Sequence, residues 1–260
     1  MKYSVEFDDV KSEDLYVYAT QRPDIPAPVY DLTEITIPGR DGALHIDNKR
    51  YEPITISITF TYVGPADSWA EIWRKCKKWM AARNTTLRFS DDNGYFYHAY
   101  NVKLDSNSRK AHRVGEFKAD FVCAPYMYLD NGTEIQEQGK TPLCILTTNG
   151  KYLLTDEGKA IRTTYWQTLI NNDYEICHPV YEITGDGNCE MFINGYEIKM
   201  YVAGTLIIDT ENEVAYRGDG EKVSQTISGR YPDMWLQPGR NKIVVQDKFD
   251  LSITPNWREL

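Results

Sequence analysis

The clearest pattern in the chain is a strict alternation of apolar and hydroxyl-bearing residues from Glu52 to Val63, EPITISITFTYV. A period of two places the isoleucines and aromatics on one face of an extended strand and the threonines and serine on the other. The segment is therefore predicted to be a half-buried antiparallel strand. We expect it to be paired on its edges, because an exposed edge of this length and apolarity invites aggregation.

After the Gly64-Pro65 break the spacing becomes helical, from Ser68 to about Ala82. Ser68 and Glu71 match a capping box, in which a hydroxyl and a carboxylate satisfy free backbone N–H groups. Apolar residues then form one broad stripe, with basic residues opposite it. The stripe comprises Trp69, Ile72, Trp73, Cys76, Trp79 and Met80. It is predicted to pack on a sheet; a partner surface is the alternative for three tryptophans on one helix.

The rest of the first half is predicted to be strands: Thr85–Ser90, Tyr95–Leu104 and Arg113–Ala124. Asp92-Asn93-Gly94 supplies a hairpin turn between the first two. From Ala124 to Pro142 the periodicity is lost, and Gly, Pro and polar residues accumulate. This composition indicates a domain boundary.

The second half alternates short strands with turn signals. Asn194-Gly195 is the strongest hairpin signal, because a type I′ turn needs positive φ at both central residues. Short strands without an intervening helix favour an antiparallel sandwich or barrel. The predicted strands are Glu175–Thr184, Cys189–Ile193, Tyr196–Val202, Thr205–Asp209, Glu213–Tyr216, Lys242–Gln246 and Leu251–Thr254.

Length and charge narrow the classes of function. The 260 residues suit one large domain or two ordinary ones. The net charge of −9, with −2 in residues 1–130 and −7 in residues 131–260, argues against a sequence-independent nucleic-acid binder. The start of the chain has no secretory signal and no segment is long and apolar enough to span a bilayer, so we expect a soluble protein. The cysteines are odd in number and scattered, which indicates reduced thiols: Cys76, Cys123, Cys144, Cys177 and Cys189.

No set of residues assembles into a catalytic, cofactor or metal site, so the chain is predicted not to be an enzyme. Its histidines lie far apart, which favours surface or sheet positions: His45, His98, His112 and His178. Gly158-Lys159 lacks the Ser or Thr of a phosphate loop. The segment from Asp186 to Glu190 lacks the glycine of a calcium loop and is interpreted as a turn. Arg217-Gly218-Asp219 is also interpreted as a turn, as are the paired acids Asp8-Asp9 and Asp91-Asp92.

The segment GRYPDMWLQPGRNKIVV, Gly229–Val245, concentrates aromatic side chains between two prolines. Pro238-Gly239 suits the central positions of a type II turn, because Pro presets φ near −65° and Gly accepts positive φ. Tyr231 and Trp235 precede that turn. They are predicted to cover one end of a sandwich, and the alternative is a platform that stacks against sugar rings.

Three features in order along the chain resemble the distal tail proteins of long-tailed bacteriophages with flexible tails. The first is EITIPGRDGALHID, Glu34–Asp47, a strand, a turn and a second strand that lead into the alternating strand. The second is the tryptophan-rich helix Ser68–Ala82. The third is the series YEITGDGNCEMFINGYEI, LIIDTENEVAY and the Gly229–Val245 segment, with ITPNWREL at the end.

The resemblance implies a mainly β protein of two domains. Residues 1–128 would form an α+β domain, barrel- or sandwich-like with one amphipathic helix, and residues 143–260 a galectin-like antiparallel β-sandwich, joined by a linker at 129–142. It also implies a hexameric ring at the distal end of the tail tube, which contacts the tail tube protein, the tail-tip fibre protein and the receptor-binding protein. DNA would pass through the ring without specific binding, in a virion assembled in the bacterial cytoplasm.

Two sets of residues follow as candidate contacts. The turn Gly39, Arg40, Asp41 and Gly42 is predicted to lie near a subunit contact of the ring. In the alternative function, a module that binds cell-wall glycans, Tyr231 and Trp235 would contact the sugar. A glycoside hydrolase is a third and weaker possibility.

Overall fold

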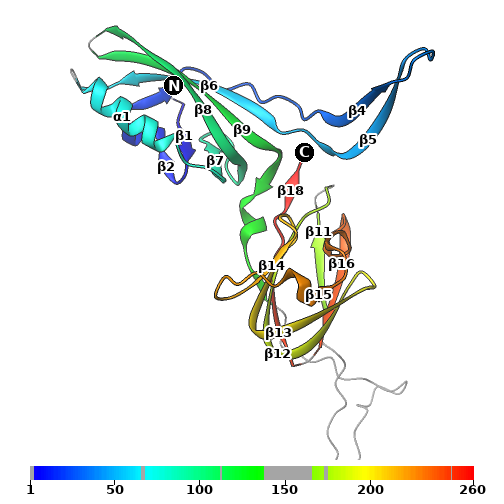
Figure 1. The fold of residues 1–260 in the computed structure, drawn as a ribbon. Coiled ribbons are helices and arrows are strands. Elements are labelled where there is room, and N and C mark those ends of the chain that lie inside the picture. Colours follow the sequence, from blue (N-terminus) through cyan, green and yellow to red (C-terminus); the bar gives the residue numbers. More distant parts are fainter. Residues whose placement is uncertain (1–2, 66–67, 112, 138–165, 173–174, 247) are drawn as a thin grey trace, which may run out of the picture. The chain divides into compact units, whose positions relative to one another are not determined.

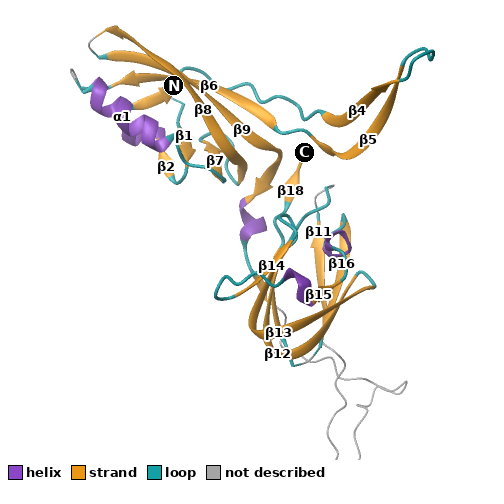
Figure 2. Ribbon diagram, in the orientation of Figure 1, coloured by secondary structure: helices purple, strands orange, loops and turns teal. Residues whose placement is uncertain are grey.

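The structure, a computed structural model, describes residues 3–65, 68–111, 113–137, 166–172, 175–246 and 248–260. The chain divides into two compact units, residues 1–130 and residues 131–259. Both are built mainly from antiparallel strands, and the first carries an α-helix (Figure 1, Figure 2). The predicted class, mainly β, is confirmed. The predicted linker 129–142 lies partly outside the described residues, and the limits of the two domains stay predictions.

The first unit folds around one curled sheet. Its order is β2-β1-β7-β8-β9-β6-β3, and a bridge between Tyr3 and Ala19 joins the start of the chain to β3. The segment before β1 therefore bridges to β3 at the far end of the sheet, in agreement with a barrel- or sandwich-like domain. The elements are β1 (Val5–Phe7), β2 (Val10–Lys11), the 3-10 helix η1 (Ser12–Leu15), β3 (Val17–Ala19), β4 (Tyr30–Thr36), β5 (Ala43–Tyr51), β6 (Ile54–Val63), α1 (Trp69–Trp79), β7 (Thr85–Phe89), β8 (Tyr95–Ala111) and β9 (Val114–Leu129).

Strand β6 confirms the alternating pattern. Its isoleucines, Phe60 and Tyr62 are buried, while Thr55 and Ser57 are exposed. It pairs with β9 from Ile54 to Val63 and, on its other side, with β3. The expectation that this strand is paired is confirmed.

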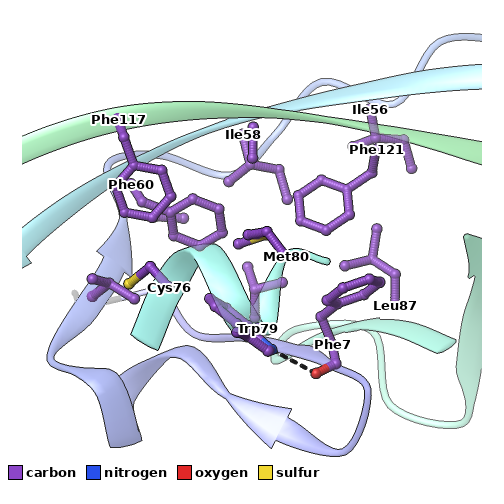
Figure 3. Close-up of a cluster of buried hydrophobic side chains, with 14 of the residues drawn as sticks. Phe7, Ile56, Ile58, Phe60, Cys76, Trp79, Met80, Leu87, Phe117 and Phe121 are labelled. Carbon is purple, nitrogen blue, oxygen red and sulfur yellow. Dashed lines mark hydrogen bonds between the residues drawn. The ribbon is translucent and has the colours of Figure 1, made fainter. Parts of the chain in front are cut away.

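Helix α1 packs its apolar stripe on the buried face of the sheet, as predicted (Figure 3). The Trp79 indole N–H donates a hydrogen bond of 2.7 Å to the carbonyl of Phe7. Its ring lies edge-on to Phe7 and Phe60. Trp79 thus connects the helix to both β1 and β6. Trp73 is partly buried against the same core.

The predicted capping box is wrong. Ser68 has helical dihedral angles, and its hydroxyl donates to the carbonyl of Pro65 at 2.9 Å rather than capping the helix. Glu71 pairs with Lys75 at 2.9 Å. The Tyr62 hydroxyl also donates to the carbonyl of Pro65 at 2.9 Å and is hydrogen-bonded to the Ser68 hydroxyl. These contacts hold the Ser68 hydroxyl away from the N–H groups of the helix. The helix also ends at Trp79, before the predicted limit.

Strands β8 and β9 form a hairpin longer than predicted. The strand expected to end at Leu104 continues to Ala111, and the one expected to end at Ala124 continues to Leu129. Residues 105–111 are exposed on both faces and so show no alternation. The predicted turn before β8 is confirmed, with Gly94 at φ +94°.

The second unit is an antiparallel assembly in which β12 is central. The strand order is β10-β17-β12-β13-β14; β16 pairs with β12 and β11, and β15 pairs with β13. The elements are the 3-10 helix η2 (Asp130–Thr133), β10 (Gln136–Glu137), β11 (Trp166–Asn171), β12 (Val180–Ile193), β13 (Tyr196–Asp209), β14 (Val214–Arg217), the 3-10 helix η3 (Ser224–Thr226), β15 (Ile227–Ser228), the 3-10 helix η4 (Tyr231–Met234), β16 (Gly239–Val245), β17 (Asp250–Thr254) and β18 (Arg258–Glu259).

Two pairs of predicted short strands are single long strands. β12 and β13 run without interruption past Thr184 and Val202, where the predicted strands end, and Gly185 lies directly opposite Gly204 in their ladder. A β-carbon on Gly185 would lie 2.4 Å from the Phe249 ring. The absence of a side chain at this position therefore leaves room for that ring in the core. The turn predicted from Asp186 to Glu190 is therefore wrong, because this segment lies within β12.

Two predicted turns of the second unit are supported. Asn194 and Gly195 have φ +51° and +93° and connect β12 to β13, as a type I′ turn requires. Gly239 has φ +86°, the positive value predicted for its turn. The buried Asn241 secures that turn by donating to the carbonyl of Gln237 at 2.7 Å and accepting from its N–H at 2.8 Å.

Candidate interaction surface

An exposed apolar surface of the first unit lies on the hairpin of β4 and β5, here called the arm. The two strands pair with each other in a sheet of their own. In Figure 1 the arm extends away from the rest of this unit. Its exposed large apolar residues are Val29, Tyr30, Leu32, Ile35, Ile37, Leu44 and Ile46.

The register of the arm sorts these side chains onto two faces. Ile35 lies opposite Leu44, and Ile46 lies opposite Thr33, so these residues share one largely apolar face. The other face is mainly polar, with Glu34 beside His45 at 3.4 Å. The arm is thus an amphipathic ribbon whose apolar face is open to solvent in the single chain.

The base of the arm is held by a polar cluster and by tyrosine rings packed edge to face. Asp31 accepts hydrogen bonds from Asn48 at 2.8 Å and from Arg50 at 2.6 Å, and these bonds lower the pKa of its carboxyl. Tyr51 packs edge-on between Tyr30, at 4.9 Å, and Tyr126 of β9, at 6.1 Å. The polar cluster thus joins β4 to β5, and the contact of Tyr51 with Tyr126 links the base of the arm to β9.

The predicted ring contact lies at the outer end of the arm. Gly39 and Gly42 have φ of +81° and +76°, so the turn needs residues that accept positive φ. Arg40 closes the turn through its N–H to the carbonyl of Ile37 at 3.2 Å. Arg40 and Asp41 are exposed. Their role in a ring contact stays a prediction.

The second candidate surface, the loop before Gly239, closes one end of the core of the second unit. Met234 and Leu236 are fully buried. The buried Tyr181 hydroxyl donates to the carbonyl of Met234 at 2.7 Å, and Cys177 and Leu236 exchange backbone hydrogen bonds of 3.0 Å. The loop therefore has the position predicted for a lid over the core.

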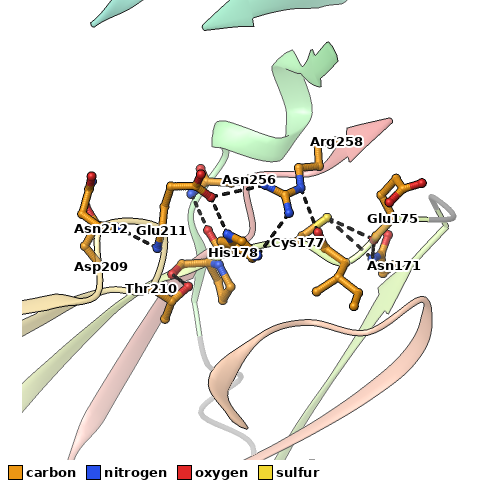
Figure 4. Close-up of polar contacts among 12 residues, drawn as sticks. Asn171, Glu175, Cys177, His178, Asp209, Thr210, Glu211, Asn212, Asn256 and Arg258 are labelled. Carbon is orange, nitrogen blue, oxygen red and sulfur yellow. Dashed lines mark hydrogen bonds and ion pairs between the residues drawn. The ribbon is translucent and has the colours of Figure 1, made fainter. Parts of the chain in front are cut away.

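A polar network holds His178 in place (Figure 4). Trp235 stacks on this histidine. The Trp235 and His178 rings are 4.3 Å apart and nearly parallel. His178 Nδ1 lies 2.5 Å from Glu211, and its Nε2 lies 3.1 Å from the guanidinium of the buried Arg258. Because a guanidinium only donates, Nε2 accepts and Nδ1 donates to Glu211. The sequence did not predict this network, because His178, Glu211 and Arg258 are far apart along the chain.

This geometry does not assemble Tyr231 and Trp235 into an open platform. Both side chains are half-buried, Tyr231 packs against the core, and His178 covers one face of the Trp235 ring. The Tyr231 hydroxyl and the Trp235 indole N–H are buried without a hydrogen-bond partner among the described residues. The predicted glycan contact is not tested by these positions and stays a hypothesis.

The other residues and motifs considered in the sequence analysis do not come together in a site among the described residues. Within the described ranges, no group of His, Cys, Asp and Glu is placed to hold a metal ion. Burial raises the pKa of the Cys76 and Cys123 thiols to about 12, which keeps them protonated. Asp8 and Asp9 form a turn, and so does the segment after Arg217, whose carbonyl accepts from Gly220 at 2.8 Å. Residues 158–159, His112 and Cys144 lie outside the described residues.

No helix in the part of the chain that the structure describes has the length and apolar character needed to cross a bilayer.

These observations define a mainly β protein of two antiparallel units, of which the first carries a tryptophan-rich helix and an exposed arm. The crystal structure of the SPP1 Dit (gp 19.1) protein has the same fold, with a TM-score of 0.59, 12% sequence identity, and 100% of this chain and 99% of that chain covered. That protein is described as a paradigm of the hub adsorption apparatus in phages that infect Gram-positive bacteria. The resemblance expected from the sequence is thus confirmed at the level of the fold. No protein-family model matches the sequence, and no curated protein matches it.

Proposed function

We propose that this chain is a structural hub protein of a phage tail and that six copies close into a ring at the distal end of the tail tube. The observation that carries the proposal is the arm, whose apolar face is uncovered in a single chain. An isolated two-stranded ribbon is at best marginally stable in water and needs a third strand or a packing partner. The fold shared with SPP1 Dit supports the same assignment.

A neighbouring copy of the chain is the partner we assign to the arm. The arm of one copy would cover its apolar face on the body of the next, with the Gly39–Gly42 turn near that contact. Such a contact joins two different patches, so it is head-to-tail and generates a ring when the rotation closes. The arm has a defined base at Tyr51 and Asp31, which would set the direction of the next subunit.

The charge of the chain supports a channel rather than a DNA-binding site. Residues 1–130 carry a net charge of −2. A wall built from this unit would have no net positive charge to retain phosphates, so DNA would pass without specific binding. The second unit, a galectin-like domain in this proposal, would face outward. The ring would contact the tail tube protein on one side and the tail-tip fibre and receptor-binding proteins on the other, in a virion assembled in the host cytoplasm.

The proposed function is tested by looking for the ring. Closure depends on concentration, so dilute protein can be monomeric. We expect mass photometry and negative-stain electron microscopy of the full chain, concentrated or mixed with its tail neighbours, to show a six-fold ring with an open centre. Monomers or closed dimers under all of these conditions would contradict the proposal.

A further inference from the structure

The solvent face of α1 carries a concentration of positive charge that the ring does not explain. Residues 71–83 contain five basic side chains and one acidic one, a net charge of +4. Because the whole chain carries −9, the other residues together carry −13. We call this surface the cationic strip; its basic residues on α1 are Arg74, Lys75, Lys77 and Lys78, and Arg83 follows the end of the helix.

Three basic residues of the strip share one side of α1. Residues 74, 77 and 78 are separated by helical spacings of three and four, so their side chains project from one side of the helix. That side is opposite the buried stripe of Trp69, Ile72, Cys76 and Trp79. The exposed Ala70 and Ala81 flank it and leave it open to approach.

Most of this charge is uncompensated. Lys75 pairs with Glu71 at 2.9 Å. Arg74, Lys77 and Lys78 have no ion-pair partner in the described part of the chain. Like charges three and four residues apart destabilise a helix. The macrodipole favours Lys77 and Lys78 in the last turn, but it does not account for Arg74 in the middle of the helix.

We propose that the cationic strip is a docking surface for a carboxylate-rich segment of a partner protein. The helix is about 16 Å long, which an extended segment of about five residues would span. Its tryptophans face the core, so no exposed ring is available to stack on nucleic-acid bases. Its apolar stripe is also covered by the sheet, so the helix cannot insert an apolar face into a membrane. The strip does expose guanidinium and ammonium groups, and these pair with the carboxylates of an acidic protein segment.

The inference is tested on the full chain with a fluorescent octa-glutamate peptide as the probe, at low salt and by anisotropy. We expect saturable binding that weakens as salt rises, since exposed charges are screened. The variant R74E/K77E/K78E should weaken binding by at least tenfold. The matched control K49E/K222E/R240E, which changes the net charge equally at exposed positions outside the strip, should bind within about twofold of the native chain.

Several outcomes would overturn the proposal. These are an absence of peptide binding, equal loss of binding in both triple variants, or tighter binding of a short DNA duplex or of phosphatidylglycerol vesicles than of the peptide. The neutral variant R74Q/K77Q/K78Q, checked by circular dichroism, separates lost binding from a misfolded helix and should also bind at least tenfold more weakly. Binding is measured on unassembled chains, so its outcome is independent of ring formation.

Discussion

Replacing Ile46 by lysine is expected to prevent ring formation while leaving the single chain folded. Ile46 lies on the apolar face of the arm and is 44% exposed. Full burial of an isoleucine contributes about 1.5–3 kcal/mol, so covering its exposed part contributes about 1 kcal/mol. A lysine at a covered position also loses hydration without a partner, which costs about 2 kcal/mol or more even when the ammonium partly escapes to water.

The expected loss is therefore about 3 kcal/mol for each contact between neighbours. At about 1.4 kcal/mol for each tenfold change, the ring should need at least about 100-fold more protein to form. Leu32 provides a matched control, because it is 49% exposed on the opposite face of the same arm and lies opposite Asp47. Leu32→Lys should assemble at the native concentration.

Sedimentation velocity over a range of concentrations measures both variants, and circular dichroism confirms that each is folded. Assembly of Ile46→Lys at the native concentration would show that the apolar face is not the contact. Equal loss in Ile46→Lys and Leu32→Lys would show that any added charge on the arm is sufficient, which would also refute the assignment of faces.

Three further predictions concern the two units separately. Gly239→Val should destabilise the second unit by more than about 1 kcal/mol, because a β-branched residue resists the φ of +86°; unchanged hydrogen exchange in β16 would refute this. The second unit should bind no galactose- or rhamnose-containing cell-wall oligosaccharide tightly in calorimetry, and micromolar binding abolished by Trp235→Ala would favour the glycan module instead. The pKa of Asp31 is lowered by Asn48 and Arg50, so its contribution to the arm is present above the ordinary aspartate pKa and is lost as pH falls through the lowered folded value; the protection of β4 and β5 from hydrogen exchange, relative to the intrinsic rate at each pH, should then fall in acid, and Asp31→Asn should remove that fall.

Features that depend on neighbouring residues were predictable from the sequence. The alternation of β6, the apolar stripe of α1 and the Asn194-Gly195 turn each follow from a local rule of geometry. The continuity of β12 and β13 was not, because Gly185 is placed by Phe249, a residue distant in sequence. The capping box failed for a local reason, because Tyr62 and Pro65, six and three residues before Ser68, bind its hydroxyl instead of the helix N-terminus.

The candidate surfaces were also predictable only in part. The arm was predictable as a hairpin, and the Gly39–Gly42 turn was located correctly as its connection. Its exposure was not predictable, because the isoleucines of a covered and an uncovered ribbon follow the same pattern. The stacking of Trp235 on His178 was also not predictable, since it depends on Arg258 and Glu211, which only the folded chain brings to the histidine.

The two tight turns of the second unit are joined by hydrogen bonds of the Asn194 side chain. The Asn194 amide donates to Asn241 Oδ1 at 2.8 Å, and its own oxygen accepts from the N–H of Lys242 at 2.9 Å. Asn241 is fully buried and bonds both the N–H and the carbonyl of Gln237, so losing its amide removes the hydrogen bonds that hold that turn. Asn194 is exposed, so water can take the place of its amide. In divergent descendants of this chain, position 241 should therefore vary less than position 194.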